Sequence, residues 1–263
     1  IDGRSNLWYF KFGEPLNLNT VNVMGISLKE YLMFGNNIPP PSGFTSDFRD
    51  AYYNAVNQYP GHNLGSGGVG NKTATGKGFA LGIGFEFDRS GDLILRKYKK
   101  SKRKQFTIYY EIAAGAELHL SFMEYAGGCS STTSPYTNYS PIGINGYRAN
   151  GGLGLYARAA AAVRWYKDNP QHSIKKNLNI ASLSSGAWAV GEFPNPNYAA
   201  GAFDGTVSVF GLYNTSFHLA FETGTSCSNS GAVSTVTVTE GDAAADQQNL
   251  LIQYINPAQA NNF

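Results

Sequence analysis

Two acidic residues at alternate positions, Glu86 and Asp88, have the spacing that paired-carboxylate chemistry requires. Residues i and i+2 of a β-strand point to the same face, so both carboxyl groups would share one side of a sheet. Glycoside hydrolysis uses such a pair, one as the acid and the other as the nucleophile or base. Glu86 and Asp88 are therefore the catalytic candidates, and a β-fold hydrolase is one function that the sequence allows.

The segment around this pair resembles the E-x-D-x-x-E strand of the laminarinase-type jelly-roll glycosidases. Gly91 occupies the position of the third acid, so the catalytic assignment of that family does not carry over to this chain. Solvated acids at a strand end, beside the turn-forming Ser90 and Gly91, explain the pattern equally well. We therefore favour a protein without enzymatic activity over a hydrolase.

Basic residues are concentrated in one short segment, which holds seven of the 20 Lys and Arg. Such a cluster can bind anionic lipid headgroups, at about 1 kcal/mol per basic residue near the surface, or a polyanionic glycan or nucleic acid. A solvated hairpin tip is the alternative interpretation. The candidates for contact with an anionic surface are Arg96, Lys97, Lys99, Lys100, Lys102, Arg103 and Lys104.

Aromatic rings in segments rich in Tyr, Asn and Ser are candidates for stacking on a sugar or on a protein partner. The alternative for each ring is ordinary packing. The five candidates are Tyr136, Tyr139, Tyr147, Trp188 and Tyr198.

The two cysteines, Cys129 and Cys227, lie in segments rich in Ser, Thr and Gly. We expect them to form one disulfide in an oxidising compartment. Closing a loop of about 100 residues would stabilise the fold by roughly 4–5 kcal/mol. Two unpaired thiols in a reducing cell are the alternative.

No motif indicates a metal or a cofactor. The Gly65–Gly70 segment fits the dinucleotide pattern G-x-G-x-x-G, but that motif requires a strand before the loop and a helix after it. This chain has the opposite order, so we expect no nucleotide partner. The four histidines are scattered without a metal-binding spacing. We therefore predict neither a metal nor a cofactor.

The composition excludes several classes of protein. Only 14% of the 263 residues are charged, 14% are aromatic and 31 are Gly, which argues against intrinsic disorder and against a helical bundle or coiled coil. The net charge of +2 is too close to neutral to indicate a nucleic-acid partner. No apolar run approaches the roughly 20 residues of a transmembrane helix.

Residues 1–77 are expected to form an N-terminal unit with a strand, two short helices and a Gly-rich connector. A capping-box pattern at Ser27–Glu30 predicts a helix that ends at Gly35. Apolar residues at helical spacing predict a second helix over Ser46–Tyr59. The strand is expected at Leu7–Phe12, and the connector at Gly65–Gly78.

From residue 78 to 263 the apolar residues alternate with small or polar ones, which is typical of β-strands. Turn-forming residues at 88–92 predict a hairpin between Gly78–Phe87 and Leu93–Tyr98. The other expected strands are Gln105–Ala114, Glu117–Tyr125, Gly152–Tyr166, Asn177–Ser184, Ala187–Phe193, Gly205–Tyr213, Ser216–Glu222, Ala232–Thr239 and Asn249–Ile255. The four consecutive alanines at 159–162 favour a helix by propensity, but their neighbours alternate.

The expected fold is all-β, with about twelve mostly antiparallel strands in a barrel or sandwich that continues from the helix-containing N-terminal unit. A transmembrane barrel turns an apolar face to lipid and a polar face to its lumen, whereas a soluble sandwich buries its apolar faces between two sheets. The final Phe263 is similar to the terminal aromatic residue of bacterial outer-membrane barrels, although Pro257 interrupts the last strand.

The first functional hypothesis is an exported, non-enzymatic β-barrel protein that associates with or inserts into membranes, as a pore or outer-membrane component. The second is a secreted adhesin or lectin-like module that binds a glycan or a protein, and the third is the hydrolase. We expect a chain that is secreted, at the cell surface or in an outer membrane. The orientation of the apolar strand faces, toward lipid or toward a protein core, separates the first hypothesis from the second.

Overall fold

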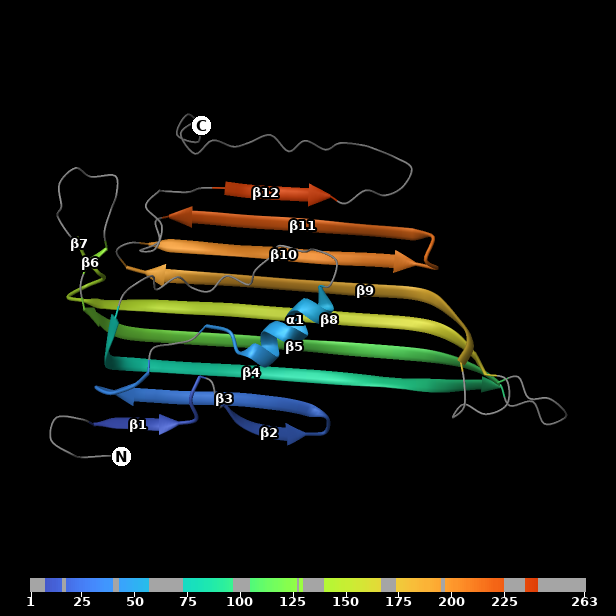
Figure 1. The fold of residues 1–263 in the computed structure, drawn as a ribbon, viewed down its shortest axis with the longest axis horizontal. Coiled ribbons are helices and arrows are strands. Elements are labelled where there is room, and N and C mark those ends of the chain that lie inside the picture. Colours follow the sequence, from blue (N-terminus) through green and yellow to red (C-terminus); the bar gives the residue numbers. More distant parts are fainter. Residues whose placement is uncertain are drawn as a thin grey trace.

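The computed structural model consists mainly of one large antiparallel β-sheet (Figure 1). The structure describes residues 8–15, 18–39, 43–56, 73–96, 105–126, 128–129, 140–166, 174–194, 197–224 and 235–240. The main sheet has ten strands, and a second sheet of two short strands lies beside it. One α-helix is present in these ranges.

The order of the main sheet is β1-β3-β4-β5-β8-β9-β10-β11-β12, and β2 also pairs with β3. Every pair is antiparallel. The elements are β1 (Tyr9–Phe12), β2 (Asn19–Val23), β3 (Ile26–Gly35), α1 (Ser46–Ala55), β4 (Thr73–Arg96), β5 (Gln105–Ala126), β6 (Gly128–Cys129), β7 (Ser140–Pro141), β8 (Tyr147–Tyr166), β9 (Ile174–Phe193), β10 (Tyr198–Val209), β11 (Tyr213–Gly224) and β12 (Thr235–Glu240).

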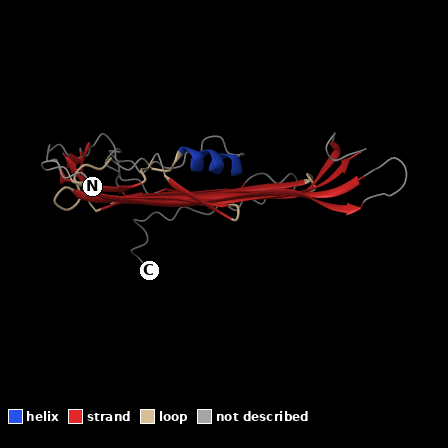
Figure 2. Cartoon of the chain, turned by 90° about the horizontal axis from the view of Figure 1, so that it is seen from below, coloured by secondary structure: helices blue, strands red, loops and turns tan. Residues whose placement is uncertain are grey.

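The sheet forms a single layer, and α1 lies on one of its faces (Figure 2). The all-β fold class is therefore confirmed, whereas the expected barrel or sandwich of about twelve strands is not what the described residues form. β1 and β12 lie at opposite margins of the sheet (Figure 1), and no second large sheet covers the other face within the described ranges. The alternation in the sequence predicts which residues share a face of the sheet, but it does not predict whether the sheet closes into a barrel.

The predicted helix from Ser27 to Gly35 is wrong, because these residues form strand β3. Ile26, Leu28, Leu32 and Phe34 alternate on one face, and β3 is paired on both sides, with β1 and β2 on one edge and β4 on the other. The capping-box pattern is a local signal, and pairing along both edges of the strand overrides it. Strand β2 was not expected from the sequence.

The predicted turn at 88–92 is also wrong, since β4 continues through it as one strand from Thr73 to Arg96. Asp88, Ser90 and Asp92 alternate with Arg89 and Gly91, and all five pair with β5. In the same way β5 and β9 each join two segments that were expected to be separate strands. Polar residues inside these strands do not end them because one face of the sheet is polar.

Two other predictions at the level of elements are confirmed. The four alanines at 159–162 lie within strand β8, and the second predicted helix is α1, which runs from Ser46 to Ala55. Thr45 caps its first turn, where the Thr45 hydroxyl accepts a hydrogen bond from the Phe48 amide at 3.3 Å. The remainder of that helix prediction, from residue 57 on, lies outside the described residues, as do most of the Gly65–Gly78 connector and the strand expected at Asn249–Ile255.

The main core lies between α1 and the sheet, where Phe44, Phe48 and Tyr52 pack against β5, β8, β9 and β10. Glycines in the sheet provide the space for these rings. A Cβ on Gly154 would lie 2.5 Å from Phe48 Cε1, and a Cβ on Gly186 would lie 2.6 Å from Tyr52 Cε2. The small residues on this side of the strands therefore let the helix approach the sheet closely.

Gly154→Ala should therefore lower the free energy of unfolding by roughly 1–3 kcal/mol, because overpacking displaces the Phe48 ring. Gly84→Ala is the matched control, since its Cβ would meet no atom closer than 3.4 Å and the strand would lose only glycine's flexibility. Denaturant titration measures both. Equal stability of the two variants would contradict the close docking of α1.

Candidate functional site

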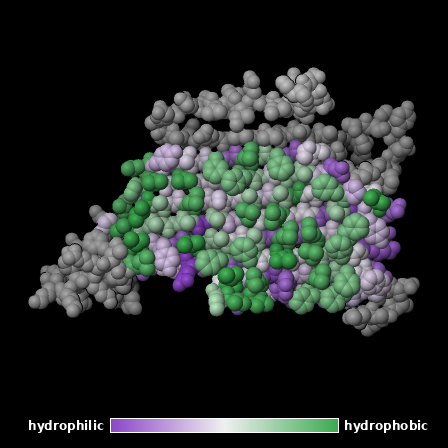
Figure 3. Space-filling view, turned by 180° about the vertical axis from the view of Figure 1, so that it is seen from behind, coloured by the Kyte–Doolittle hydropathy of each residue, from purple (hydrophilic) through white to green (hydrophobic). Residues whose placement is uncertain are grey.

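The face of the sheet opposite α1 is covered by exposed apolar side chains (Figure 3). We call this surface the apolar face. It consists of alternate residues of β3 (26–34), β4 (79–93), β5 (108–122), β8 (149–163), β9 (181–193), β10 (199–209) and β11 (213–223). On β5 and β8 none of these positions is charged, and on the other strands Glu30 and Arg89 are the charged residues among them.

The apolar face extends far along each of its long strands. From Phe122 to Ile108 on β5, the uncharged positions extend roughly 46 Å along the strand, at about 3.3 Å per residue. A strand tilted by about 45° would cross roughly 33 Å with that length, close to the hydrocarbon core of about 30 Å.

A row of aromatic residues crosses one end of the apolar face. Phe10, Phe34, Phe79 and Phe122 are successive cross-strand partners on β1, β3, β4 and β5. The Phe10 and Phe34 rings stack with their centroids 5.0 Å apart, and Tyr147 stacks on Phe122 at 5.5 Å. Transmembrane barrels carry aromatic girdles at both interfaces, whereas this row lies at one end of the apolar face, over β1, β3, β4 and β5.

The charged residues gather on the opposite face, which we call the polar face. Arg148 pairs with Glu192 and His218 with Asp204, all four being buried. Pairing offsets the cost of removing charges from water. The acids and bases that β3, β4, β5 and β8–β11 place here include Lys29, Glu86, Asp88, Asp92, Glu111, Glu117, His119, Arg148, Arg158, Arg164, Glu192, Asp204, His218 and Glu222.

Polar contacts hold α1 on the polar face at both of its ends. At the N-terminal end, Glu117 accepts hydrogen bonds from the Thr45 amide, at 2.8 Å, and from the Thr45 hydroxyl. Lys29 pairs with Asp47 at 3.4 Å and with Glu86 at 3.0 Å. A carboxylate near the first turn also interacts favourably with the helix dipole.

Toward the other end of α1, the Tyr52 hydroxyl donates a hydrogen bond to Asp204 at 3.4 Å. Asp204 also contacts His218, so a helix residue and two strand residues form one buried polar chain. Burial, and then the neighbouring Asp204 carboxylate, raise the pKa of the Tyr52 phenol well above its ordinary value. Tyr52 therefore remains a neutral donor to this carboxylate.

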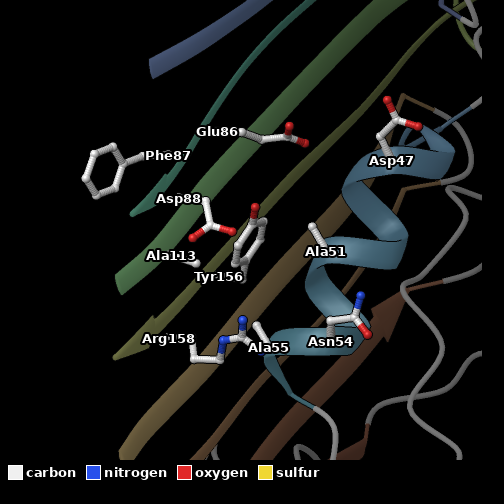
Figure 4. A pocket seen from close by; sticks show the side chains of 10 residues that line it. All are labelled: Asp47, Ala51, Asn54, Ala55, Glu86, Phe87, Asp88, Ala113, Tyr156 and Arg158. Carbon is white, nitrogen blue, oxygen red and sulfur yellow. The ribbon is translucent and has the colours of Figure 1, made fainter. Parts of the chain in front are cut away.

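A pocket of about 390 Å³ opens between α1 and the polar face (Figure 4). Glu86, Asp88, Tyr156 and Arg158 line it from the sheet, and α1 contributes Asp47, Ala51, Asn54 and Ala55. The structure thus brings both catalytic candidates, Glu86 and Asp88, into one pocket, with Glu86 held by the Lys29 ammonium. A catalytic role for them stays a prediction.

The aromatic candidates are divided between the two faces of the sheet. Tyr147 is the residue that stacks on Phe122 beside the apolar face. Trp188 and Tyr198 pack against the core on the polar face, where Tyr198 donates a hydrogen bond to Glu222 at 3.1 Å. Tyr136 and Tyr139 lie outside the described residues, so Tyr147, Trp188 and Tyr198 are the three whose positions are known. These three do not form one stacking surface.

The basic cluster and the proposed disulfide fall mostly outside the described residues. Arg96 ends β4, and Lys97, Lys99, Lys100, Lys102, Arg103 and Lys104 follow it in the segment that leads to β5. Cys129 belongs to β6, whereas Cys227 lies outside the described ranges. Both expectations stay predictions.

Sequence reasoning missed the residues that attach α1, above all Thr45, Glu117 and Asp204. The sequence carries one signal for the two acids, Glu117 and Asp204, because each occupies a strand position that alternates with apolar residues. That pattern predicts a polar face but does not show that a helix covers it. His119 and His218, two of the four scattered histidines, are buried, and the structure pairs His218 with Asp204.

In the described part of the chain, no helix has the length and hydropathy to cross a bilayer. No three His, Cys, Asp or Glu side chains in the described ranges gather as a metal site would require. The chain matches no protein-family model, no curated protein and no solved structure. Its function is therefore inferred from its own residues.

Replacing Thr45 should release the N-terminal end of α1. Thr45→Ala removes the helix cap and the hydroxyl's hydrogen bond to the buried Glu117 carboxylate, a loss of roughly 1–3 kcal/mol, while the backbone amide still donates to Glu117. We expect trypsin to cleave after Arg49 at least about five-fold faster, since this free energy governs local opening. Thr45→Ser keeps the hydroxyl and should be cleaved at the wild-type rate. Mass spectrometry of the cleavage time course measures this. Unchanged cleavage of Thr45→Ala would refute the role of Thr45 in holding the N-terminal end of α1 on the sheet.

Proposed function

We propose that the chain is a non-enzymatic protein embedded in a membrane, as a pore or an outer-membrane component. The apolar face contacts the acyl chains of the bilayer. The polar face, with α1 docked on it, is turned toward water. The observation that carries this proposal is the separation of side chains, with hydrocarbon exposed on one face and charge collected on the other, beneath a helix.

The apolar face is costly in water. Transfer of apolar surface out of water is worth about 25 cal/mol per Å², and soluble monomers rarely expose contiguous apolar patches larger than a few hundred Å². Here the exposed residues include Phe79, Ile83, Phe85, Leu120, Phe122, Leu153, Leu155, Leu183, Phe203, Leu219 and Phe221. Acyl chains would remove this cost over the whole face at once.

Both ends of the apolar face suit contact with a lipid interface. Beyond the aromatic row, Lys77 and Glu124 form an exposed ion pair at 3.0 Å. At the other end, β4 ends at Arg96 and β5 begins at Gln105, so the basic cluster is attached at the margin of the apolar face. Anionic headgroups are the partner that such a margin would attract.

The polar face suits the water-filled side of a transmembrane sheet. Transmembrane β-proteins have polar interiors, and in some of them a helix or a loop fills the lumen. Here α1 occupies that position, attached by ion pairs and hydrogen bonds as well as by the aromatic core around Phe44, Phe48 and Tyr52. The charges of Arg148, Glu192, Asp204 and His218 are paired on this side and need no contact with lipid.

The decisive change places a charge in the middle of the apolar face. Leu153 is 44% exposed and lies between Leu118 and Ala189. Leu153→Arg should cost roughly 2–4 kcal/mol at the centre of a bilayer. We expect at least about 30-fold less protein to float with vesicles of phosphatidylcholine and phosphatidylglycerol, and release of an entrapped dye to fall in parallel.

Leu212→Arg is the matched control, because Leu212 is 92% exposed in the turn between β10 and β11. It should float and release dye like the wild-type protein. A wild-type chain that stays soluble, monomeric and inert toward these vesicles would refute the proposed function, and so would equal losses in the two variants.

A further inference from the structure

Both edges of the main sheet are unpaired in the described part of the chain. β1 and β2 form one edge, since both pair only with β3, and β12 forms the other, since it pairs only with β11. The two edges lie at opposite margins (Figure 1). The apolar face extends to the edge strands β1 and β2 through Phe12, Val21 and Val23, and at the other side to β11, the neighbour of β12, through Leu219 and Phe221.

An open edge is incompatible with a lipid environment. Each unpaired backbone N–H and C=O would face hydrocarbon, where no water can satisfy it, so transmembrane sheets are closed. If the apolar face meets lipid, the two edges must find partners. Each edge also has the main-chain groups to form a continuous ladder with another strand.

The strand directions restrict which edges can meet. Each strand of the main sheet runs antiparallel to its neighbours, so β12, seven steps from β3, runs in the opposite direction to β3. β1 and β2 also run opposite to β3, with which they pair. The three edge strands β1, β2 and β12 therefore point the same way (Figure 1). Pairing β12 with β12 of another copy would either invert that copy across the bilayer or place an apolar face beside a polar face. Only a head-to-tail contact, with β12 of one copy against β1 and β2 of the next, leaves the apolar faces of both copies on the same side and their strands in the same direction across the bilayer.

The helix argues against closure by one chain alone. The described sheet has nine strand positions, counting both edges, and about eight strands enclose only enough space for side chains. Cans that contain a central helix have about 11 strands. In this sheet α1 and the rings of Tyr156 and Trp188 already occupy the polar face.

We propose that the β12 edge of one copy pairs with the β1–β2 edge of a second copy, so that the unit in the membrane is a closed sheet built from two or more copies. This proposal rests on the proposed function and names its partner, a second copy of this chain. The contact is heterologous, and such contacts generate rings when the rotation closes.

Cross-linking across the two edges tests the proposal. Thr20 on β2 and Thr237 on β12 lie on one cross-strand row of the polar face, through Lys29, Gly84, Glu117, Gly154, Trp188, Ala202 and Ala220. In a background of Cys129→Ser and Cys227→Ser, one tagged chain carries Thr20→Cys and an untagged chain carries Thr237→Cys. Both are reconstituted together in phosphatidylcholine and phosphatidylglycerol vesicles and treated with a short bis-maleimide. Thr235→Cys and Thr239→Cys extend the test to a staggered register.

We expect a tagged–untagged heterodimer from at least one of these pairs, and no homodimer from Thr237→Cys alone. A chain carrying both cysteines that cross-links only within itself would overturn the proposal, because one chain would then close the sheet. The proposal also fails if the vesicle-bound chains give no cross-link at any position, or if Thr237→Cys forms a homodimer. Flotation of the same samples separates these outcomes from failure of the proposed function, in which no chain would be bound to vesicles.

Discussion

A β-strand turns successive side chains to opposite faces, and in this chain that alternation separates hydrocarbon from charge across one sheet. The other features depend on this separation. Because the apolar residues share one face, they cannot bury themselves within the single layer of described strands. Because the charged residues share the other face, the helix that covers them must offer hydrogen bonds as well as rings.

The polar face shows how such a surface is made stable. Charges there occur in pairs, such as Arg148 with Glu192, and Thr45, which caps the helix, also donates a hydrogen bond to the Glu117 carboxylate. Where the helix carries an aromatic ring, the strand below carries glycine, as at Gly154 beneath Phe48. A soluble protein would have the opposite arrangement, with the helix packed on the apolar face. The observed arrangement therefore favours lipid as the solvent of the face that remains exposed.

The sequence predicted the period-two strands well, because alternation is a strong and repeated signal. It also placed α1 correctly from the spacing of Phe48, Tyr52 and Ala55. It failed where a local signal opposed the long-range pairing. The capping-box pattern at Ser27–Glu30 lies in a strand that is paired on both edges, and the turn-forming residues at 88–92 lie inside β4.

The site could be predicted only in part for a similar reason. Alternation places Glu86 and Asp88 on one face, and the structure agrees, but the pocket also needs α1, which the sequence does not position. The contacts of Glu117 with Thr45 and of Asp204 with Tyr52 join residues far apart in the chain. No local pattern contains that information. The openness of the sheet is likewise a property of its edges, which alternation does not determine.

In the proposed arrangement the face opposite α1, and not the face beneath it, meets acyl chains. Phe203 and Trp188 allow a direct comparison, because they lie on adjacent rows of neighbouring strands and on opposite faces. In a Trp8→Phe, Trp165→Phe background, one protein keeps Trp188, and a second carries Trp188→Phe with Phe203→Trp.

Both proteins are reconstituted in vesicles of phosphatidylcholine brominated on its acyl chains, and their tryptophan fluorescence is compared with that in unbrominated vesicles. We expect strong quenching for Phe203→Trp and little for Trp188. Quenching of Trp188 as strong as that of Phe203→Trp, or quenching of neither, would contradict it.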